Sequence, residues 1–277
     1  MKEKMKRQLS YDDIIDKKDK SAIASQNSEI KDKQRLYIVD LIIKLLLNTI
    51  NNNVSIIIID TPYCNATIFI LETLRKSYIL WETFIRRGYY IVAINNGEYN
   101  KYDDNFKTYD EVINNRYSAI VCCTYEHTLT DYLTSDQEDE LTLNRETIKV
   151  KPTIGLIWMD TSSNLFHRKE NDKTIYSTMD VLIDRMKLNK INITKECYLA
   201  LTYSLRKNCN HNFENHENEF CRKIEKLITN CNIELYLKFS SATYNKNCRF
   251  AVGKISYFNR NSFTRINDKD IIPKLDF

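Results

Sequence analysis

The 277-residue chain is 43% hydrophobic and 11% aromatic, which is enough apolar side chain for one large α/β domain or two small ones and excludes a chain that needs disulfides to fold. Its net charge of +4 is too small an excess to hold a nucleic acid by itself. The eight cysteines, several of them within apolar runs, indicate buried free thiols in a reducing compartment, and the first residues do not resemble a signal peptide. We therefore expect a soluble intracellular protein, cytoplasmic or nuclear, that meets no membrane.

The first segment differs from the rest in charge. Lysines crowd residues 1–33, which lack a sustained apolar period and are predicted to form a disordered basic tail. A solubilising arm is the simpler interpretation of this tail, and an electrostatic aid to nucleic-acid binding is the sharper one. Residues 34–277 are predicted to form a single domain that begins with an apolar helix over 34–50.

The domain is centred on an apolar run followed by a polar turn. Val54–Ile59 is rich in β-branched residues and almost uninterrupted, which predicts a strand buried on both faces. The turn then supplies the carboxylate of Asp60, and either Asn65 or Thr67 is predicted to cap a helix over 66–77. Ligands of open parallel sheets lie beyond the carboxyl ends of the strands. The turn is therefore predicted to form part of a small-molecule site.

Three further predicted strands also end in polar residues. They span 89–94, 117–123 and 153–159, and a fifth strand spans 196–203. Helices are predicted over 67–87 with a break near Ser77, and over 109–115, 174–188 and 219–230, while 136–140 is predicted to be an exposed loop or a helix start. Two last strands, 233–239 and 249–257, are joined by a polar loop of hairpin length.

This order of elements resembles that of the class I S-adenosylmethionine-dependent methyltransferases over about residues 34–257: an apolar leading helix, five alternating strands and helices, and a terminal hairpin. The resemblance implies an α/β fold of three layers, in which a doubly wound, mostly parallel seven-stranded sheet ends in a C-terminal antiparallel hairpin. This is the Rossmann-like methyltransferase fold. The resemblance also implies S-adenosylmethionine as the cofactor.

The family's first motif falls on the turn after the first strand, where Asp60, Thr61, Pro62 and Asn65 would approach the methionine part of the cofactor. A sulfonium cofactor needs a carboxylate or carbonyl groups near its positive charge and amide donors for its own carboxylate, and this turn has both kinds of group. The chain departs from the family here, because the glycine-rich loop is absent.

The family's other positions fall on the following strand ends. Asn95 or Asn96 would hydrogen-bond the ribose hydroxyls, although the family usually has an acidic residue there. Thr124 and Tyr125 would flank the adenine. Asp160 would meet the acceptor, and it is the candidate catalytic residue because methyl transfer needs orientation and a group that accepts or positions the acceptor's proton.

A second resemblance would imply a different order of the strands in the chain. The string 60–63, Asp-Thr-Pro-Tyr, is similar to the Asp/Asn-Pro-Pro-Tyr string of methyltransferases that act on adenine or glutamine nitrogens. In that family the string follows the fourth strand, so this alternative requires a permuted strand order.

Four zinc-type ligands also occur within one short stretch, but their spacing matches no standard zinc finger. A polar loop with incidental ligands is the preferred interpretation, and no metal is predicted for Cys209, His211, His216 and Cys221.

The function predicted first is methyl transfer from S-adenosylmethionine to a nucleic acid, RNA or DNA. The basic tail and the supply of tyrosines that can stack on an unpaired base favour this acceptor. The alternative is a catalytically inactive methyltransferase-like domain that serves as a binding or structural subunit. The missing glycines favour the inactive domain, and the polar strand ends favour the enzyme. A nucleotide-binding enzyme of other chemistry on the same sheet is a third possibility.

Overall fold

The computed structural model describes residues 29–95, 103–136, 138–143, 146–161, 165–166, 174–204, 213–240 and 248–257. Within these ranges the main sheet has seven strands, in the spatial order β3 (Cys122–Tyr125), β2 (Tyr90–Ile94), β1 (Val54–Ile59), β6 (Thr153–Asp160), β7 (Asn192–Ser204), β9 (Cys248–Tyr257) and β8 (Ile233–Phe239). The first five are parallel, and β9 is antiparallel to both of its neighbours. A separate antiparallel hairpin consists of β4 (Asp139–Leu143) and β5 (Glu146–Val150).

This strand order confirms the predicted fold. The first strand lies at the centre, the next two follow on one side, and two more parallel strands and a closing antiparallel pair follow on the other side. The chain reaches each side by helical crossovers, as a doubly wound sheet requires. The arrangement is the Rossmann-like methyltransferase fold.

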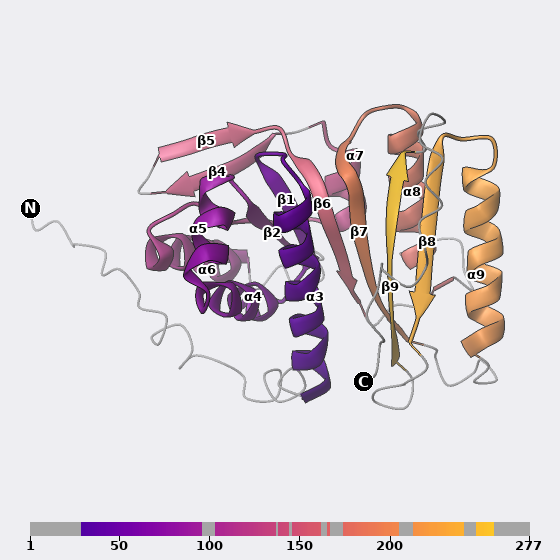
Figure 1. Cartoon of the computed structure of the whole chain (residues 1–277), viewed down its shortest axis with the longest axis horizontal. Helices are drawn as coiled ribbons and strands as arrows, with labels where there is room; N and C mark the ends of the chain where they lie inside the picture. Colours follow the sequence, from indigo (N-terminus) through magenta and orange to yellow (C-terminus); the bar gives the residue numbers. More distant parts are fainter. Residues whose placement is uncertain are drawn as a thin grey trace, which may run out of the picture.

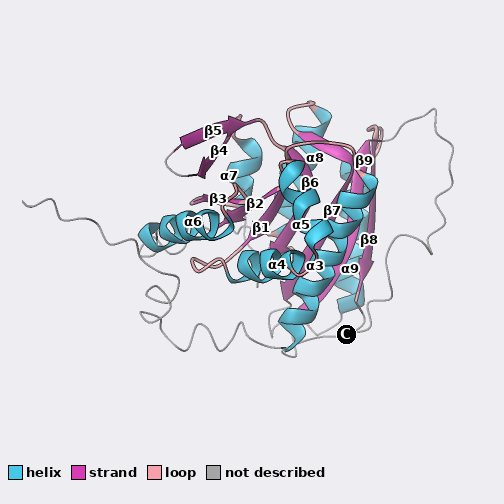
Figure 2. Cartoon of the chain, turned by 60° about the vertical axis from the view of Figure 1, so that its left-hand side comes forward, coloured by secondary structure: helices cyan, strands magenta, loops and turns pink. Residues whose placement is uncertain are grey.

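Helices cover both faces of the sheet, which gives three layers (Figures 1 and 2). One face carries α3 (Glu29–Asn48), α4 (Asn65–Arg75), α5 (Tyr78–Arg86) and α6 (Asp103–Tyr117), and the other carries α7 (Leu129–Thr134), α8 (Ile175–Lys187) and α9 (Phe213–Ile228). Each face therefore has its own hydrophobic core. The central strand β1 serves both cores, which explains its nearly continuous run of isoleucines.

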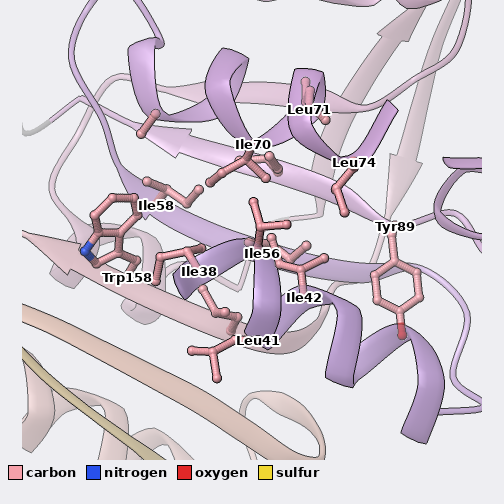
Figure 3. Packing of buried hydrophobic residues seen from close by; sticks show 14 of the residues in the cluster. Ile38, Leu41, Ile42, Ile56, Ile58, Ile70, Leu71, Leu74, Tyr89 and Trp158 are labelled. Carbon is pink, nitrogen blue, oxygen red and sulfur yellow. The ribbon is translucent and has the colours of Figure 1, made fainter. Parts of the chain in front are cut away.

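The core beneath α3 fixes the position of that helix on the sheet. Figure 3 shows Ile38 of α3 beside Trp158 of β6 and Ile58 of β1. Further along, Leu45 approaches Gly155 so closely that an added Cβ there would lie 3.2 Å from Leu45 Cδ1 and 2.5 Å from Val54 Cγ1. A side chain at position 155 would therefore require Val54 to move and Leu45 of the helix to shift. Since α3 thus runs antiparallel to β6, its N-terminal turns lie at the carboxyl edge of the sheet.

The outer edge of β3 is covered by side chains of α6. Asn114 Oδ1 accepts hydrogen bonds from the backbone N–H groups of Val121 and Cys122, at 3.0 and 3.2 Å, and its Nδ2 donates to the carbonyl oxygens of Cys122 and Thr142, at 2.9 and 3.2 Å. Asp110 accepts a hydrogen bond from the backbone N–H of Thr124. These contacts satisfy an edge that would otherwise be free to pair with another strand.

The hairpin β4–β5 is a feature that the sequence did not predict. Asp139, the first residue of β4, is buried, and its carboxylate accepts hydrogen bonds from the hydroxyls of Tyr90 at 2.6 Å and Tyr132 at 2.9 Å. The expectation of an exposed loop over 136–140 is confirmed at Asp136 and Glu138, which are exposed and lie outside any helix or strand, and is wrong at Asp139 and Glu140, which begin β4. Tyr90, 49 residues away, and Tyr132, seven residues away, make the burial of this carboxylate possible.

Several predicted boundaries also differ. Helix α3 begins at Glu29, before the expected Gln34, and residues 1–28 of the predicted tail lie outside the described residues. Tyr117 ends α6 and does not begin the third strand, because its ring packs on Trp81 and its hydroxyl donates to Glu72 Oε1 at 2.7 Å. The predicted break near Ser77 is confirmed by the separate helices α4 and α5.

The seven cysteines within the described ranges are free, as expected, and four of them are buried. No described helix has the length and apolarity needed to cross a membrane.

Candidate active site

The register of the parallel strands brings the predicted site residues to one edge of the sheet. Ile59 at the end of β1 pairs with Ile94 of β2, and Ile94 pairs with Tyr125 of β3. On the other side of β1, Ile58 pairs with Trp158 of β6. The carboxyl ends of all four strands therefore meet at the same edge, which carries Asp60, Asn95, Thr124, Tyr125 and Asp160.

Asp60 is buried and caps helix α4 with its side chain. Its carboxylate accepts hydrogen bonds from the backbone N–H groups of Thr61 at 2.7 Å, Ala66 at 3.2 Å and Thr67 at 2.8 Å, and from the Thr67 hydroxyl at 2.8 Å. Burial raises the pKa of this carboxyl, and the hydrogen bonds from Thr67, Thr61 and Ala66 oppose that rise.

The expected capping by Asn65 or Thr67 is wrong. Asn65 is the first helical residue, and Thr67 donates its hydroxyl to Asp60. The N-cap position is held by Cys64, whose φ of 49° lies in the left-handed region and whose side chain makes no cap hydrogen bond. A carboxylate from the preceding strand end thus does what a local cap usually does.

The rest of the turn is held in place from within and from α6. The Cys64 N–H donates to the Thr61 carbonyl oxygen at 2.9 Å, and Pro62 is buried. The ring of Tyr63 meets that of Tyr109 of α6 edge to face, with centroids 5.7 Å apart. The turn is therefore a packed structure that lies between β1 and α6.

The ends of β2 and β3 remain hydrogen-bonded beyond the strands. Asn95 is buried, and its backbone N–H donates to the Tyr125 carbonyl oxygen at 3.0 Å. Tyr125 and Thr124 are half-buried, and the ring of Tyr125 meets those of His127 and Tyr132 edge to face. The predicted alternative to Asn95, Asn96, lies outside the described residues.

Asp160 at the end of β6 forms an ion pair with Lys31 of helix α3. Both side chains are largely covered, with exposed fractions of 21% for Asp160 and 15% for Lys31. The contact joins the first turns of α3 to the carboxyl edge. Sequence reasoning missed Lys31 because it assigned residues 1–33 to a tail. The helical spacing Lys31, Ile38 and Leu45, which places all three on one face, is the signal that would have found it.

A second polar cluster that the sequence did not reveal lies at the end of β7. The hydroxyl of Tyr203 donates to the carboxylate of Glu217 of α9, and Arg249 Nη1 of β9 donates to both oxygens of that carboxylate, at 2.9 and 3.2 Å. The guanidinium of Arg249 also stacks on Phe213, 4.3 Å from its centroid. All these groups are at least partly buried, so the cluster attaches α9 to the sheet.

The strand order also decides between the two predicted alignments. In a permuted enzyme the strand before the Asp-Thr-Pro-Tyr string would be the fourth of the fold, and its successor would lie toward the antiparallel end of the sheet. Here β2 and β3 lie on the side away from the antiparallel pair β9–β8. The permuted alternative is therefore wrong. Of the four possible zinc ligands, Cys209 and His211 lie outside the described residues.

No protein family and no curated protein matches the sequence. The chain is similar to solved structures of low sequence identity. An S-adenosylmethionine-dependent methyltransferase from Aquifex aeolicus is 12% identical, with a TM-score of 0.38 over 86% of this chain and 99% of that one. An O-methyltransferase from Bacillus cereus in complex with S-adenosylhomocysteine is 11% identical, with a TM-score of 0.43 over 89% and 90%. The fibrillarin pre-rRNA processing protein of Methanococcus jannaschii is 8% identical, with a TM-score of 0.38 over 76% and 70%. The strand order itself carries the assignment of the fold, which is that of the Rossmann-like methyltransferases.

Proposed function

We propose that the protein is an S-adenosylmethionine-dependent methyltransferase whose acceptor is a nucleic acid. The observation that supports this most is the set of polar side chains at the carboxyl ends of four adjacent parallel strands, β3, β2, β1 and β6. Open α/β sheets bind their ligands at this edge. The methyltransferase strand order makes methyl transfer the first reaction to test there, by fold-level analogy.

The residues at the ends of β2 and β3 are of types that suit the adenosine half of the cofactor. Asn95 has an amide that can donate to one ribose hydroxyl and accept from another, and Tyr125 and Thr124 offer a ring and a short polar side chain for the adenine. The cofactor would supply an activated methyl group on its sulfonium. The turn that contains Thr61, Pro62 and Asn65 lies next to this position and would contact the methionine part.

The acceptor half of the site is assigned to Asp160. Its carboxylate lies at the end of β6, next to the turn after β1, and it would hold or accept the proton of the attacking group. The lysines of residues 1–33 and the tyrosines near the edge, Tyr63 and Tyr125, support a nucleic acid as the acceptor class.

One observation favours a second candidate, a catalytically inactive domain that serves as a binding or structural subunit. The Asp60 carboxylate uses the N–H groups of Ala66 and Thr67. These N–H groups begin helix α4, where a bound carboxylate would otherwise find its donors. An enzyme with this turn must bind the methionine carboxylate through other groups.

Calorimetric titration of S-adenosylmethionine and S-adenosylhomocysteine into the full-length protein separates the two candidates. Micromolar binding that Asn95→Ala weakens about tenfold would support the enzyme, since one or two lost hydrogen bonds correspond to about 1.4 kcal/mol. Glu140→Gln, an exposed change on the hairpin, is the matched control and should leave binding unchanged. Titrations without heat for either ligand would favour the inactive subunit. Asp60→Ala is a poor probe because it also removes the cap of α4.

A further inference from the structure

The first turns of α3 lie beside the candidate active site, because Lys31 contacts Asp160 there. Along α3, Leu45 approaches Gly155 and Ile38 lies beside Trp158 (Figure 3). Lys31, one heptad before Ile38, reaches Asp160. The three residues of β6 that α3 contacts, Gly155, Trp158 and Asp160, lie at successive positions toward the carboxyl end of the strand. The ammonium of Lys31 is therefore positioned by the packing of the whole helix.

The cations of these turns have different kinds of partner. Lys33 pairs with Glu29 at 3.1 Å, and Arg35 pairs with Asp32 at 2.8 Å, so both contact carboxylates of their own helix. Lys31 instead contacts a carboxylate of the sheet, 129 residues away in sequence. That carboxylate belongs to Asp160, the residue assigned to the acceptor's proton.

The ion pair conflicts with that assignment as long as it stays closed. The Lys31 ammonium occupies one oxygen of the Asp160 carboxylate, so that oxygen is not open to the acceptor's attacking group while the pair is closed. Asp160 must therefore be released when the acceptor arrives. An anionic group on the acceptor can do this by taking over the ammonium, and the charged oxygens of a phosphodiester are well suited to bind a lysine.

A second observation concerns a buried polar atom on the same turns of α3. Gln34 lies one turn from Lys31 on the same side of α3 and is 1% exposed, yet its Oε1 has no hydrogen-bond partner among the described residues. A buried amide oxygen without a donor is costly. Lys31 thus offers a cation that suits a phosphate, and Gln34 offers an acceptor that the described residues leave unsatisfied.

We propose that Lys31 binds a phosphate of the nucleic-acid acceptor and releases Asp160 when it does so. This inference rests on the proposed function and adds to it the group that recognises the acceptor. The Asp160 carboxylate then becomes available only when an acceptor is in place. The pair is partly exposed, so a phosphate can reach Lys31 without unfolding of α3.

The test is the binding of a fluorescein-labelled single-stranded RNA of about 12 nucleotides and mixed sequence, measured by anisotropy with the full-length protein. Lys31→Gln should weaken binding about tenfold and lower the slope of log K against log salt by about 0.7, as expected for one lost contact to a single strand. Asp160→Asn should tighten binding about threefold, because Lys31 no longer has to leave a carboxylate. Lys31→Arg should stay close to the wild type.

Lys33→Gln is the matched control, because Lys33 carries the same charge two residues away and pairs within its own helix. It should change the affinity less than twofold, and circular dichroism melts should show that all variants are folded. Weaker RNA binding by Lys31→Gln together with tighter RNA binding by Asp160→Asn is the result that identifies the transfer of Lys31 from Asp160 to a phosphate. Equal or weaker binding by Asp160→Asn, unchanged binding by Lys31→Gln, or no RNA binding by the wild type would each overturn the inference.

The cofactor titration tests the proposed function separately, because that assay contains no acceptor. Cofactor binding without RNA binding would leave a methyltransferase with another acceptor. RNA binding with the expected pattern but without cofactor binding would leave a phosphate site on an inactive domain.

Discussion

Replacement of Asp110 by asparagine should remove a loss of stability that the wild-type chain suffers as the pH rises. Asp110 lies on α6, where its carboxyl accepts hydrogen bonds from the Thr124 N–H and from Asn114 Nδ2, the latter at 3.1 Å. Burial raises the pKa of this carboxyl to about 7, the nearby Glu111 adds to the rise, and the two hydrogen bonds oppose it. In the unfolded chain the same group titrates near its ordinary pKa of about 3.9.

Between these two pKa values the folded protein keeps a proton that the unfolded chain releases. The free energy of unfolding therefore falls by about 1.4 kcal/mol per pH unit over this window, or about 4 kcal/mol in all, and the loss is complete above about pH 7. Below about pH 4 both states are protonated, so the stabilising contribution of Asp110 is fully present there.

Urea unfolding of the wild type and Asp110→Asn, followed by circular dichroism at several pH values between about 4 and 8, measures this contribution. Other titrating groups are common to both chains and cancel in the difference. The free energy of unfolding of the variant minus that of the wild type should rise by about 4 kcal/mol from the acidic to the alkaline end. A difference that stays constant with pH would show that the buried carboxyl titrates normally and would refute the reasoning.

Three further substitutions test the packing of the sheet and its helices. Gly253→Ala should destabilise the protein by about 3 kcal/mol in urea unfolding, because the new Cβ would lie 1.9 Å from the Tyr236 carbonyl oxygen; an unchanged midpoint would contradict this. Asn114→Ala should cost about 3 kcal/mol in the same assay, since two buried N–H groups lose their acceptor, and amide exchange at Cys122 should accelerate. Asp60→Ala should cost about 2 kcal/mol and raise amide exchange at Thr67, whereas Asp60→Asn should lose less.

Much of the fold could be predicted from the sequence because strands that are buried on both faces have an apolar pattern that is easy to recognise. Strand β1 occupies the predicted residues Val54–Ile59, since a strand covered on both faces must be apolar at nearly every position. Strand β8 likewise has its predicted bounds, Ile233–Phe239. The polar residue after each parallel strand could be predicted to share an edge with the others because the topology forces it.

The elements that were missed depend on partners distant in the sequence. Strand β5 is exposed along most of its length, so its sequence has little of the apolar pattern that predicts a strand. Strand β4 begins with an aspartate, a residue type that is more typical of loops. Asp139 is buried only because Tyr90 and Tyr132 bring hydroxyls to it. The first turns of α3 carry the local ion pairs Lys33–Glu29 and Arg35–Asp32, and Lys31 adds a pair with the distant Asp160 of β6. Local propensity contains no information about the distant partners.

Asp60 shows how one residue can support the fold prediction and complicate the function. A carboxylate directly after a buried strand predicted a turn and a helix, and the structure has both. The oxygens of the same carboxylate accept hydrogen bonds from the N–H groups of Thr61, Ala66 and Thr67, so these N–H groups are not open to a ligand. Glycine-rich turns leave such N–H groups open to a bound anion. In this chain the protein itself supplies that anion, so the proposed cofactor would depend mainly on the adenosine side of the site, where Asn95 lies. Asn95 is therefore the residue at which the enzyme and the inactive subunit should first be distinguished.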